Sequence, residues 1–264
     1  MASMSSRREF LLTATTVAGV VSGCSSDPTE TMSSERSQTT TRAPKSGQKT
    51  SKASVETTPI DRGPVARAPI PDAPDAYTYT TMGSSDASLT VEYYGNWKCP
   101  YCQQFSTNGL VEIVREYVKS GQIRLQFRTL AYTRNDANEW EVWPGEDAAR
   151  IGEVGLGIWE TDPAASWPFH ETVVENQGDP GSEWATFDRL ETLARRAGME
   201  QWAPVERRAS EKQFRPRLLQ TARTAEANGI SSTPTLNVDG RVLVPIDQDG
   251  FIEKTVFEAI DEQM

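Results

Sequence analysis

The motif Cys99-Pro100-Tyr101-Cys102 lies between a predicted strand and a predicted helix, and this placement constrains the fold more than any other feature of the sequence. Residues 89–94 are β-branched and aromatic, which is typical of a strand. Apolar residues recur at helical spacing over 105–117, and residues 123–130 indicate a second strand. A right-handed crossover between two parallel strands places the motif at the amino end of the helix, where free N–H groups favour a negative charge.

The region that follows alternates between predicted helices and strands. Residues 145–228 are expected to be helical, because every third residue over 184–193 is apolar and Gly229 follows as a stop signal. Strands at 235–238 and 241–244 flank Asp239-Gly240, a strong signal for a two-residue hairpin. A last helix is expected over about 249–262. We therefore predict an α/β domain with an inserted helical subdomain at about 145–228.

Residues 1–24 have the features of an export signal. Arg7-Arg8 precede an apolar run over 10–21 that is too short to cross a bilayer as a permanent helix, and this pattern resembles a twin-arginine signal. The run ends in Val21-Ser22-Gly23-Cys24, which resembles a lipobox with Cys24 as the lipid attachment site. Ordinary signal cleavage, with Cys24 discarded or left free, is the alternative. Lipidation would leave one cysteine pair in the chain.

Residues 25–75 are predicted to form a disordered tether. They are rich in Ser, Thr and Pro and carry seven acidic and seven basic residues with few large apolar ones. Such a segment cannot bury enough apolar surface to fold. We therefore place the folded domain at 76–264.

The predicted domain is acidic. From Ala76 onward there are 18 Lys plus Arg against 29 Asp plus Glu, and the whole chain has a net charge of −10. An acidic domain argues against nucleic acid as a partner. Lysine is scarce, with 7 Lys against 20 Arg. An acidic, lysine-poor surface resembles that of halophilic proteins.

Three cysteines and one histidine restrict the chemistry that the chain can perform. A zinc site built on Cys99 and Cys102 needs two further ligands, and the chain offers only His170 and the distant Cys24. We therefore expect no metal and no other cofactor. A structural disulfide across two residues would restrict little of the unfolded chain, so we interpret the pair as redox-active. His170 is expected to pack or to cap within the helical region.

The order of these elements resembles that of the DsbA-like family of thioredoxin-fold oxidoreductases. The resemblance covers about 77–264, and its most specific parts are residues 95–105 and 229–241. It implies a thioredoxin fold and a cis peptide bond before Pro234, which would face the cysteine pair. It also implies that Thr233 contacts the substrate backbone.

The two cysteines are expected to differ in role. Cys99 is the predicted nucleophile, with the helix terminus as the main cause of a lowered thiol pKa and the exposed ammonium of Lys98 as a smaller one. Cys102 lies one turn further in, where burial should raise its pKa, and it would resolve the mixed disulfide.

Two features depart from the family pattern. The most oxidising members have a histidine between the cysteines, where this chain has Pro100-Tyr101. Many relatives also have a buried acid six residues before the nucleophile, where this chain has Tyr93. The neighbouring Glu92 should point to the other face of the sheet, so the role of that acid is not transferred to it.

The sequence therefore predicts an extracytoplasmic, lipid-anchored oxidase or isomerase. Its partners would be exported cysteine-containing proteins and a membrane redox partner. One alternative is a membrane-anchored reductase for cytochrome or copper-site maturation. The other is a binding lipoprotein in which the CPYC motif has no catalytic role.

Overall fold

The computed structural model describes residues 62–264, so the predicted signal, Cys24 and the tether up to residue 61 lie outside the described part. In chain order its elements are η1 (Pro74–Ala76), β1 (Thr81–Met82), β2 (Leu89–Gly95), α1 (Pro100–Thr107), α2 (Gly109–Ile113), the π-helical turn η2 (Val114–Val118), β3 (Ile123–Thr129), β4 (Tyr132–Arg134), β5 (Trp140–Val142), α3 (Glu146–Thr161), α4 (Pro163–Glu175), α5 (Phe187–Arg196), α6 (Trp202–Ser210), α7 (Arg215–Ala227), β6 (Thr235–Val238), β7 (Arg241–Leu243), β8 (Ile246–Asp247), β9 (Gly250–Phe251) and α8 (Glu253–Asp261).

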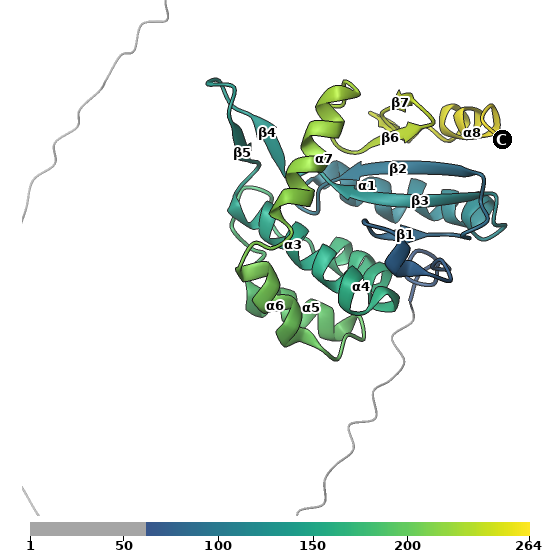
Figure 1. Ribbon diagram of the computed structural model, residues 1–264. Coiled ribbons are helices and arrows are strands. Elements are labelled where there is room, and N and C mark those ends of the chain that lie inside the picture. The colour runs from purple at the N-terminus through teal and green to yellow at the C-terminus, as the bar shows by residue number, and fades with distance from the viewer. Residues whose placement is uncertain (1–61) are drawn as a thin grey trace, which may run out of the picture. The chain divides into compact units, whose positions relative to one another are not determined.

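The central sheet has the strand order β1-β3-β2-β6-β7 (Figure 1). Strand β2 pairs with β3 in parallel and with β6 antiparallel, so Tyr93 lies opposite Phe127 on one side and Leu236 on the other. The predicted strand, helix and parallel strand around the motif are confirmed. The hairpin of β6 and β7 is also confirmed, and its turn residues Asp239 and Gly240 both have positive φ, at 48° and 90°.

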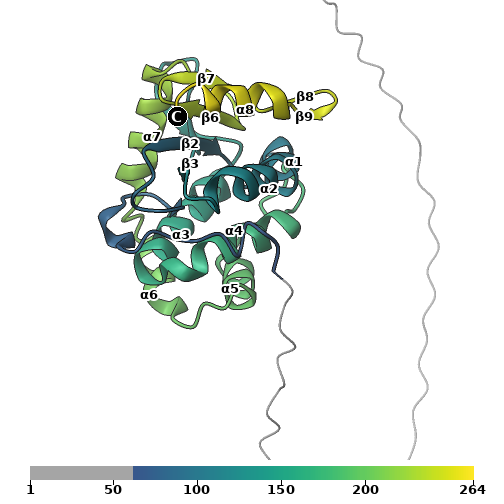
Figure 2. The same cartoon turned by 90° about the vertical axis from the view of Figure 1, so that its right-hand side faces the viewer.

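Helices cover both faces of the sheet. Figure 2 shows α7 on one face of β2 and β3, with α1 and α2 on the other. Successive residues of β2 follow this division, because the Tyr93 ring contacts Phe105 of α1 at a centroid distance of 5.0 Å, whereas Tyr94 packs with Ala225 of α7. Strand β2 is therefore buried on both faces, and it ends directly before the CPYC motif.

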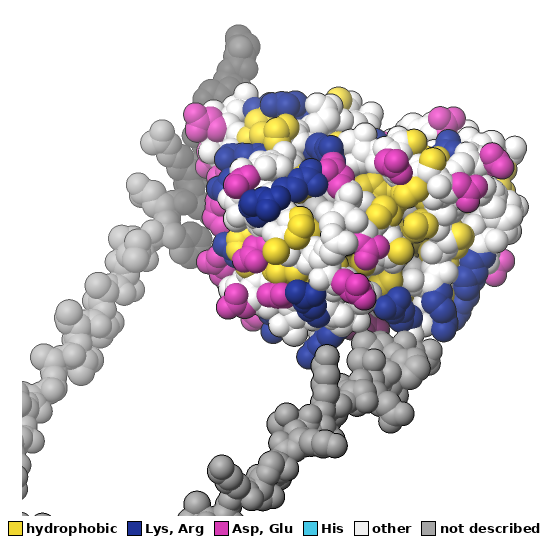
Figure 3. All heavy atoms as spheres, turned by 60° about the horizontal axis from the view of Figure 1, so that its bottom comes forward, with side chains coloured by type: hydrophobic (Ala, Val, Ile, Leu, Met, Phe, Trp, Pro, Cys, Tyr) yellow, Lys and Arg dark blue, Asp and Glu magenta, His cyan; other side chains and the backbone are white. Residues whose placement is uncertain are grey.

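The predicted helical insertion is present as helices α3 to α7. Helix α3 is buried over most of its length, since α4, α6 and α7 pack around it. A Cβ atom added at Gly155 of α3 would lie 2.4 Å from the Trp97 ring, so this glycine allows α3 to approach the residues before the motif closely. On the face in Figure 3, basic and acidic side chains are interspersed, with apolar side chains between them.

The ordered domain begins earlier than the sequence predicted. Residues 62–75, which were assigned to the tether, pack against the helices, and Val65 is 2% exposed within the main core. The backbone N–H groups of Gly63 and Ala66 both donate to the Glu171 carboxylate, at 2.5 and 3.1 Å. A few apolar residues and one acidic side chain on α4 thus order a segment whose composition is that of a linker.

Three small strand pairings were not predicted. They involve β1, the hairpin of β4 and β5, and the hairpin of β8 and β9, and each of these strands has only two or three residues. Strands this short show no periodicity. The last helix begins at Glu253 rather than at 249, because β9 occupies residues 250–251. Over residues 62–264, no helix is both long and apolar enough to span a membrane.

Candidate active site

The two cysteines lie at the amino end of α1. Cys99 is the N-cap residue with extended backbone, and Pro100 occupies the first helical position, where its missing N–H costs no hydrogen bond. Both cysteines are free, buried thiols, with Cys99 9% and Cys102 3% exposed. Tyr101, between them, is 62% exposed. The motif therefore keeps a small part of Cys99 accessible and buries Cys102 more deeply.

Polar contacts fix the loop before the motif. The Asn96 backbone N–H lies 3.4 Å from the Cys102 sulfur, and its side-chain amide donates to the Leu130 carbonyl at 2.9 Å. The Gln177 side chain donates to the carbonyls of Trp97 and Cys99, at 2.6 and 3.1 Å. Asn96 and Gln177 therefore hold the motif in register with the neighbouring strand and the helical subdomain.

Lys98 differs from its predicted state. Its side chain is 2% exposed, and its ammonium lies 2.5 Å from the Asp147 carboxylate of α3. The prediction of an exposed ammonium beside Cys99 is therefore wrong. The physical reason is the close approach of α3, which provides a buried carboxylate for Lys98.

The pKa values of the two thiols move in opposite directions. The pKa of Cys99 is lowered to about 6, first by a hydrogen bond with the Cys102 thiol and then by Thr233 and the backbone amides of Tyr101 and Cys102, against the effect of burial. Burial raises the pKa of Cys102, and the neighbouring Cys99 raises it further. The helix terminus thus contributes to the acidity of Cys99, but the partner thiol is the largest cause.

The predicted substrate-contacting residues lie beside Cys99. The Thr233–Pro234 peptide bond is cis, and the Cys99 thiol donates to the Thr233 carbonyl across 3.4 Å. The structure therefore brings together the cysteine pair, Thr233 and Pro234. His170 is also close, since it lines the same small cavity as Cys102.

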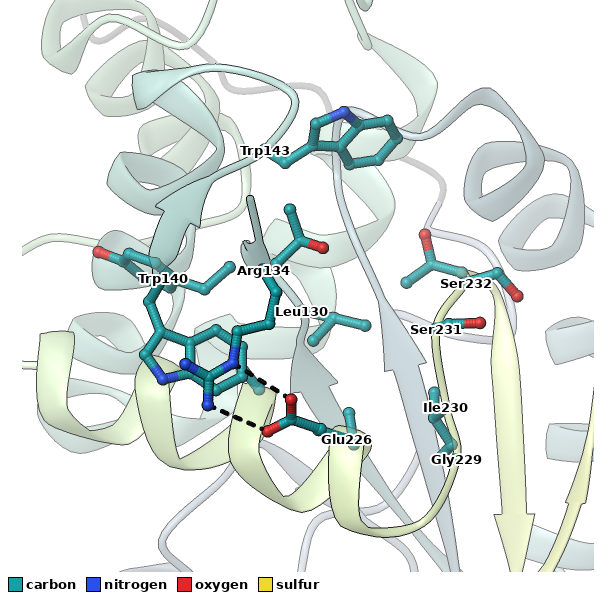
Figure 4. Close-up of a pocket in the computed structure, with 14 residues that line it drawn as sticks. Leu130, Arg134, Trp140, Trp143, Glu226, Gly229, Ile230, Ser231 and Ser232 are labelled. Carbon is teal, nitrogen blue, oxygen red and sulfur yellow. Dashed lines mark hydrogen bonds and ion pairs between the residues drawn. The ribbon is translucent and has the colours of Figure 1, made fainter. Parts of the chain in front are cut away.

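An open groove begins at Thr233 and runs between α7 and the hairpin of β4 and β5 (Figure 4). Its volume is about 430 Å³. Trp143 and Trp140 lie on one side and the loop of Ile230 on the other, and Trp143 is 55% exposed. Arg134 stacks over the Trp140 ring at 3.9 Å and forms an ion pair with Glu226, so the charge at this end of the groove is balanced.

Several residues that shape the site were not predicted from the sequence. Asn96, Asp147, Gln177 and Trp143 come from loops or from the first turn of a helix, where no periodic pattern marks them. Only proximity to the motif could have drawn attention to Asn96. Among residues 62–264, no group of three or more His, Cys, Asp or Glu side chains is placed to hold a metal ion.

Comparisons with known proteins agree with this fold. A family model described as Thioredoxin matches residues 75–254. Disulfide bond formation protein D of Bacillus subtilis is 23% identical over 175 residues, which are 66% of this chain and 74% of that protein. Two crystal structures share the fold.

The first of these structures is oxidised BdbD from Bacillus subtilis, with a TM-score of 0.60, 22% identity and coverage of 70% of this chain and 92% of that one. The second is DsbA from Chlamydia trachomatis, with a TM-score of 0.57, 17% identity and coverage of 70% and 90%. The aligned regions span most of each relative.

Proposed function

The chain belongs to the thioredoxin family and is a DsbA-like thiol-disulfide oxidoreductase, and on this premise we propose that it passes the Cys99–Cys102 disulfide to exported proteins outside the cytoplasm. The single observation that carries this proposal is the contrast between the two thiols. Cys99 is 9% exposed and has a pKa of about 6, whereas Cys102 is 3% exposed and has a raised pKa. A partly accessible thiolate that leaves readily and a more deeply buried partner suit disulfide transfer.

The reaction consists of two exchanges. A client thiolate attacks the Cys99 sulfur, the bond to Cys102 breaks, and Cys102 takes the electron pair. A second client thiolate then attacks the client sulfur of this mixed disulfide and expels the Cys99 thiolate. The client gains one disulfide, and the enzyme is left with two thiols. Because a more acidic thiol is a better leaving group, the lowered pKa of Cys99 favours the second step.

Clients would be extended, unfolded polypeptide segments that lie across Thr233 and enter the groove. Three features support this: the groove starts beside Cys99, one of its sides carries exposed tryptophan, and its one ion pair is internally balanced. Such a surface suits an apolar or aromatic residue next to the client cysteine. It offers no unpaired charge for a strongly charged client.

We place the enzyme at the extracytoplasmic face of the membrane, anchored through lipid on Cys24 after export by the Arg7-Arg8 signal. These residues lie outside the described part of the chain, so the support is the sequence pattern alone. The dithiol would be reoxidised by a membrane redox partner. Precursor with Arg7→Lys and Arg8→Lys should stay in the cytoplasm, and its normal export would contradict this placement.

Trapping of clients in cells tests the proposed function. With Cys102→Ser, Cys99 can still attack a disulfide of an exported protein, and the mixed disulfides should accumulate on non-reducing gels because Cys102, which would close onto Cys99 and release them, is absent. With Cys99→Ser, none should form. Traps that form with Cys99→Ser alone would reverse the roles, and a failure of both variants to trap clients would contradict the function.

A further inference from the structure

Three polar side chains from three different elements lie in series behind the Cys102 thiol. Tyr93 of β2 lines the same narrow gap as Cys102. Its hydroxyl lies 3.3 Å from the Ser106 hydroxyl of α1, which lies 3.1 Å from Nε2 of His170 on α4. The polar contacts therefore run from a phenol beside the buried sulfur to an imidazole.

The surroundings of this series are aromatic and closed to solvent. Tyr93 and His170 are 0% and 2% exposed, and the imidazole packs on the rings of Trp97 and Phe127, with centroid distances of 5.8 and 5.0 Å. Desolvation lowers the pKa of His170 to about 3, and burial raises the pKa of Tyr93. At neutral pH the imidazole is uncharged and the phenol keeps its proton. Each group can then both donate and accept a hydrogen bond.

Ser106 and His170 line two spaces. The inner one is a narrow gap, bordered also by Tyr93 and Cys102, that is too small for a water molecule. The outer cavity, of about 250 Å³, lies between the 63–65 segment and helices α1 and α4, and the exposed residue Glu175 lies on its rim. His170 lines this outer cavity, and its Nδ1 atom is buried and makes no hydrogen bond to any described residue. The polar series therefore ends at the wall of the outer cavity.

Cys102 needs a proton partner that no nearby acid provides. It holds its proton because its pKa is raised, yet it must lose that proton to attack and regain one after it leaves. Glu92, the nearest acid before the motif in the sequence, is on the other face of β2 and pairs with Arg128 at 2.5 Å. Asp147 is committed to Lys98 and to the backbone of the loop before α5.

We propose that Tyr93, Ser106 and His170 form a proton relay between the Cys102 thiol and the outer cavity. The inference rests on the proposed function, because it assigns the proton path of the resolving step in thiol-disulfide exchange. Tyr93 is the member that exchanges the proton with Cys102, since it lies beside the reacting sulfur. Ser106 and His170 act through Tyr93, and together the three groups replace a buried acid by a chain of neutral donors and acceptors.

The relay balances in both directions. When Cys102 closes onto Cys99 of a mixed disulfide, the new S–S bond forms, the bond from Cys99 to the client breaks, and the client leaves as a thiolate with the electron pair. The Cys102 proton passes to Tyr93, the Tyr93 proton to Ser106 and the Ser106 proton to Nε2 of His170, while Nδ1 releases its proton to water. When a client thiolate opens the disulfide, the series runs backwards and restores the first imidazole tautomer.

Few other titratable groups face the relay. Cys99 adjoins Cys102 on α1. Glu171 and Glu175 of α4 border the outer cavity, where Glu171 accepts backbone hydrogen bonds from the 63–66 segment. Burial raises the pKa of Glu175, and Glu171 raises it further. The variants used in the test below keep Glu171 and Glu175. These two carboxylates therefore contribute equally to the pH profile of every variant.

Closure of the Cys99–Cys102 disulfide in the full chain tests the relay. Cys99 is held in a mixed disulfide with glutathione, and the release of glutathione is followed at neutral pH. Tyr93→Phe keeps the ring and should slow release by at least about tenfold, the low side of what positioned acid-base groups contribute. Attack of Cys99 on oxidised glutathione should change by less than about twofold, since that step does not need the Cys102 proton. Tyr94→Phe is the matched control, because its hydroxyl donates to Glu92 on the other face of β2, and it should change neither step.

A second variant and a solvent experiment complete the test. Ser106→Ala should slow release about as much as Tyr93→Phe, and the double variant should be little slower than either, because the groups act in series. In the unaltered protein, the rate should fall in a curved way with the deuterium fraction of the solvent, since several protons move together. An unchanged rate in Tyr93→Phe, full additivity with Ser106→Ala, or a linear deuterium dependence would overturn the relay. No release from the unaltered protein would instead overturn the proposed function.

Discussion

The Lys98 ammonium lies 2.5 Å from the Asp147 carboxylate, and both side chains are almost completely buried. The second carboxylate oxygen accepts the backbone N–H groups of Trp184 and Ala185, at 2.9 and 3.1 Å. Lys98 also donates to the Ser182 carbonyl at 2.9 Å. The residue before Cys99 is thus tied both to α3 and to the loop that precedes α5.

Loss of Lys98 should destabilise the fold strongly. Lys98→Met removes one partner and leaves the Asp147 carboxylate buried without a counter-charge, which costs about 3–5 kcal/mol. Urea denaturation would measure the change in the free energy of unfolding. Lys254→Met is the matched control, because Lys254 is 88% exposed and its contact with Glu258 is long, at 3.7 Å. The free energy of unfolding should therefore change little. Similar changes in the free energy of unfolding for both variants would show that the buried pair stabilises the fold no more than an exposed pair does.

The Cys99 thiol should titrate near pH 6 in the reduced protein. Its folded pKa lies below that of an ordinary thiol, so the thiolate stabilises the reduced fold at high pH, and this stabilisation is lost as the pH falls through about 6. Thiolate absorbance and the rate of alkylation by iodoacetamide would both report the midpoint. In Cys102→Ala the midpoint should rise, because the largest cause of the lowered pKa is removed. A midpoint at or above about 8.5 in the unaltered protein would contradict this origin.

The same titration predicts a more oxidising pair. With a pKa of about 6, the thiolate stabilises the reduced form at pH 7 by ~1.4 kcal/mol relative to a thiol that stays protonated, which corresponds to ~30 mV for two electrons. Equilibration with glutathione buffers would measure the potential. Cys102→Ala cannot serve as a comparison, because no cysteine pair remains in it. The test is therefore made on the unaltered protein, in which the slope of the reduction potential against pH should change near pH 6.

The motif and its flanking elements could be predicted because each has a local signature. Strand β2 is a run of β-branched and aromatic residues, and the Asp239-Gly240 turn has the residues that positive φ requires. These features depend on neighbours in the sequence. The register that brings Thr233 to Cys99 is not local, and it could be expected only from the resemblance to a family.

The remaining features depend on contacts between distant residues. Lys98 and Asp147 are 49 positions apart, and nothing near Lys98 in the sequence indicates that α3 will bury it. Gly63 and Glu171 are 108 positions apart, which is why a segment with the composition of a tether joins the ordered domain. From sequence alone, a charged or polar residue is expected to be exposed, because such residues are mostly found at protein surfaces. Only the tertiary packing shows which of them are buried.

The contribution of Glu153 to protein stability should fall as the pH rises through the range in which Glu153 ionises. Glu153 is 3% exposed, accepts the Phe214 backbone N–H at 2.8 Å, and has a pKa raised by burial to about 7. Since an unfolded glutamate titrates near about 4.3, the folded state binds more protons between about pH 4.5 and 7. The stabilisation from protonated Glu153 therefore falls across this range, by at most about 3 kcal/mol, and does not change further once both states are ionised. His170, whose folded pKa is lowered to about 3, acts in the opposite direction and adds stability as the pH rises to about 6.5. Urea denaturation of the disulfide form, in which Cys99 does not titrate, should therefore show the Glu153 loss between pH 5 and 8 as a difference between the unaltered protein and Glu153→Gln.

In Glu153→Gln the loss between pH 5 and 8 should be largely absent, because the amide does not ionise and can still accept from Phe214. Glu112→Gln serves as the control, since Glu112 is 38% exposed and makes only a surface ion pair with Arg115. Its pH dependence should match that of the unaltered protein. A Glu153→Gln variant with the same pH dependence as the unaltered protein would show that Glu153 is ionised at no cost in the fold.

Trp143→Ala should weaken the binding of peptide clients without changing the chemistry of the cysteines. The Trp143 side chain is 55% exposed on one side of the groove that starts at Thr233, so it can cover an apolar client residue and bury both surfaces. Truncation of such an aromatic contact costs roughly 1–2 kcal/mol, which is about a 5- to 30-fold rise in KM. With a reduced dicysteine peptide that carries phenylalanine beside one cysteine, KM should rise by this factor while kcat stays within about twofold.

The rate with glutathione should stay unchanged, because glutathione does not reach the groove. Val244→Ala, at a comparably exposed apolar residue that does not line the groove, should leave KM unchanged. Equal effects of the two variants, or a parallel loss with glutathione, would place the client outside the groove.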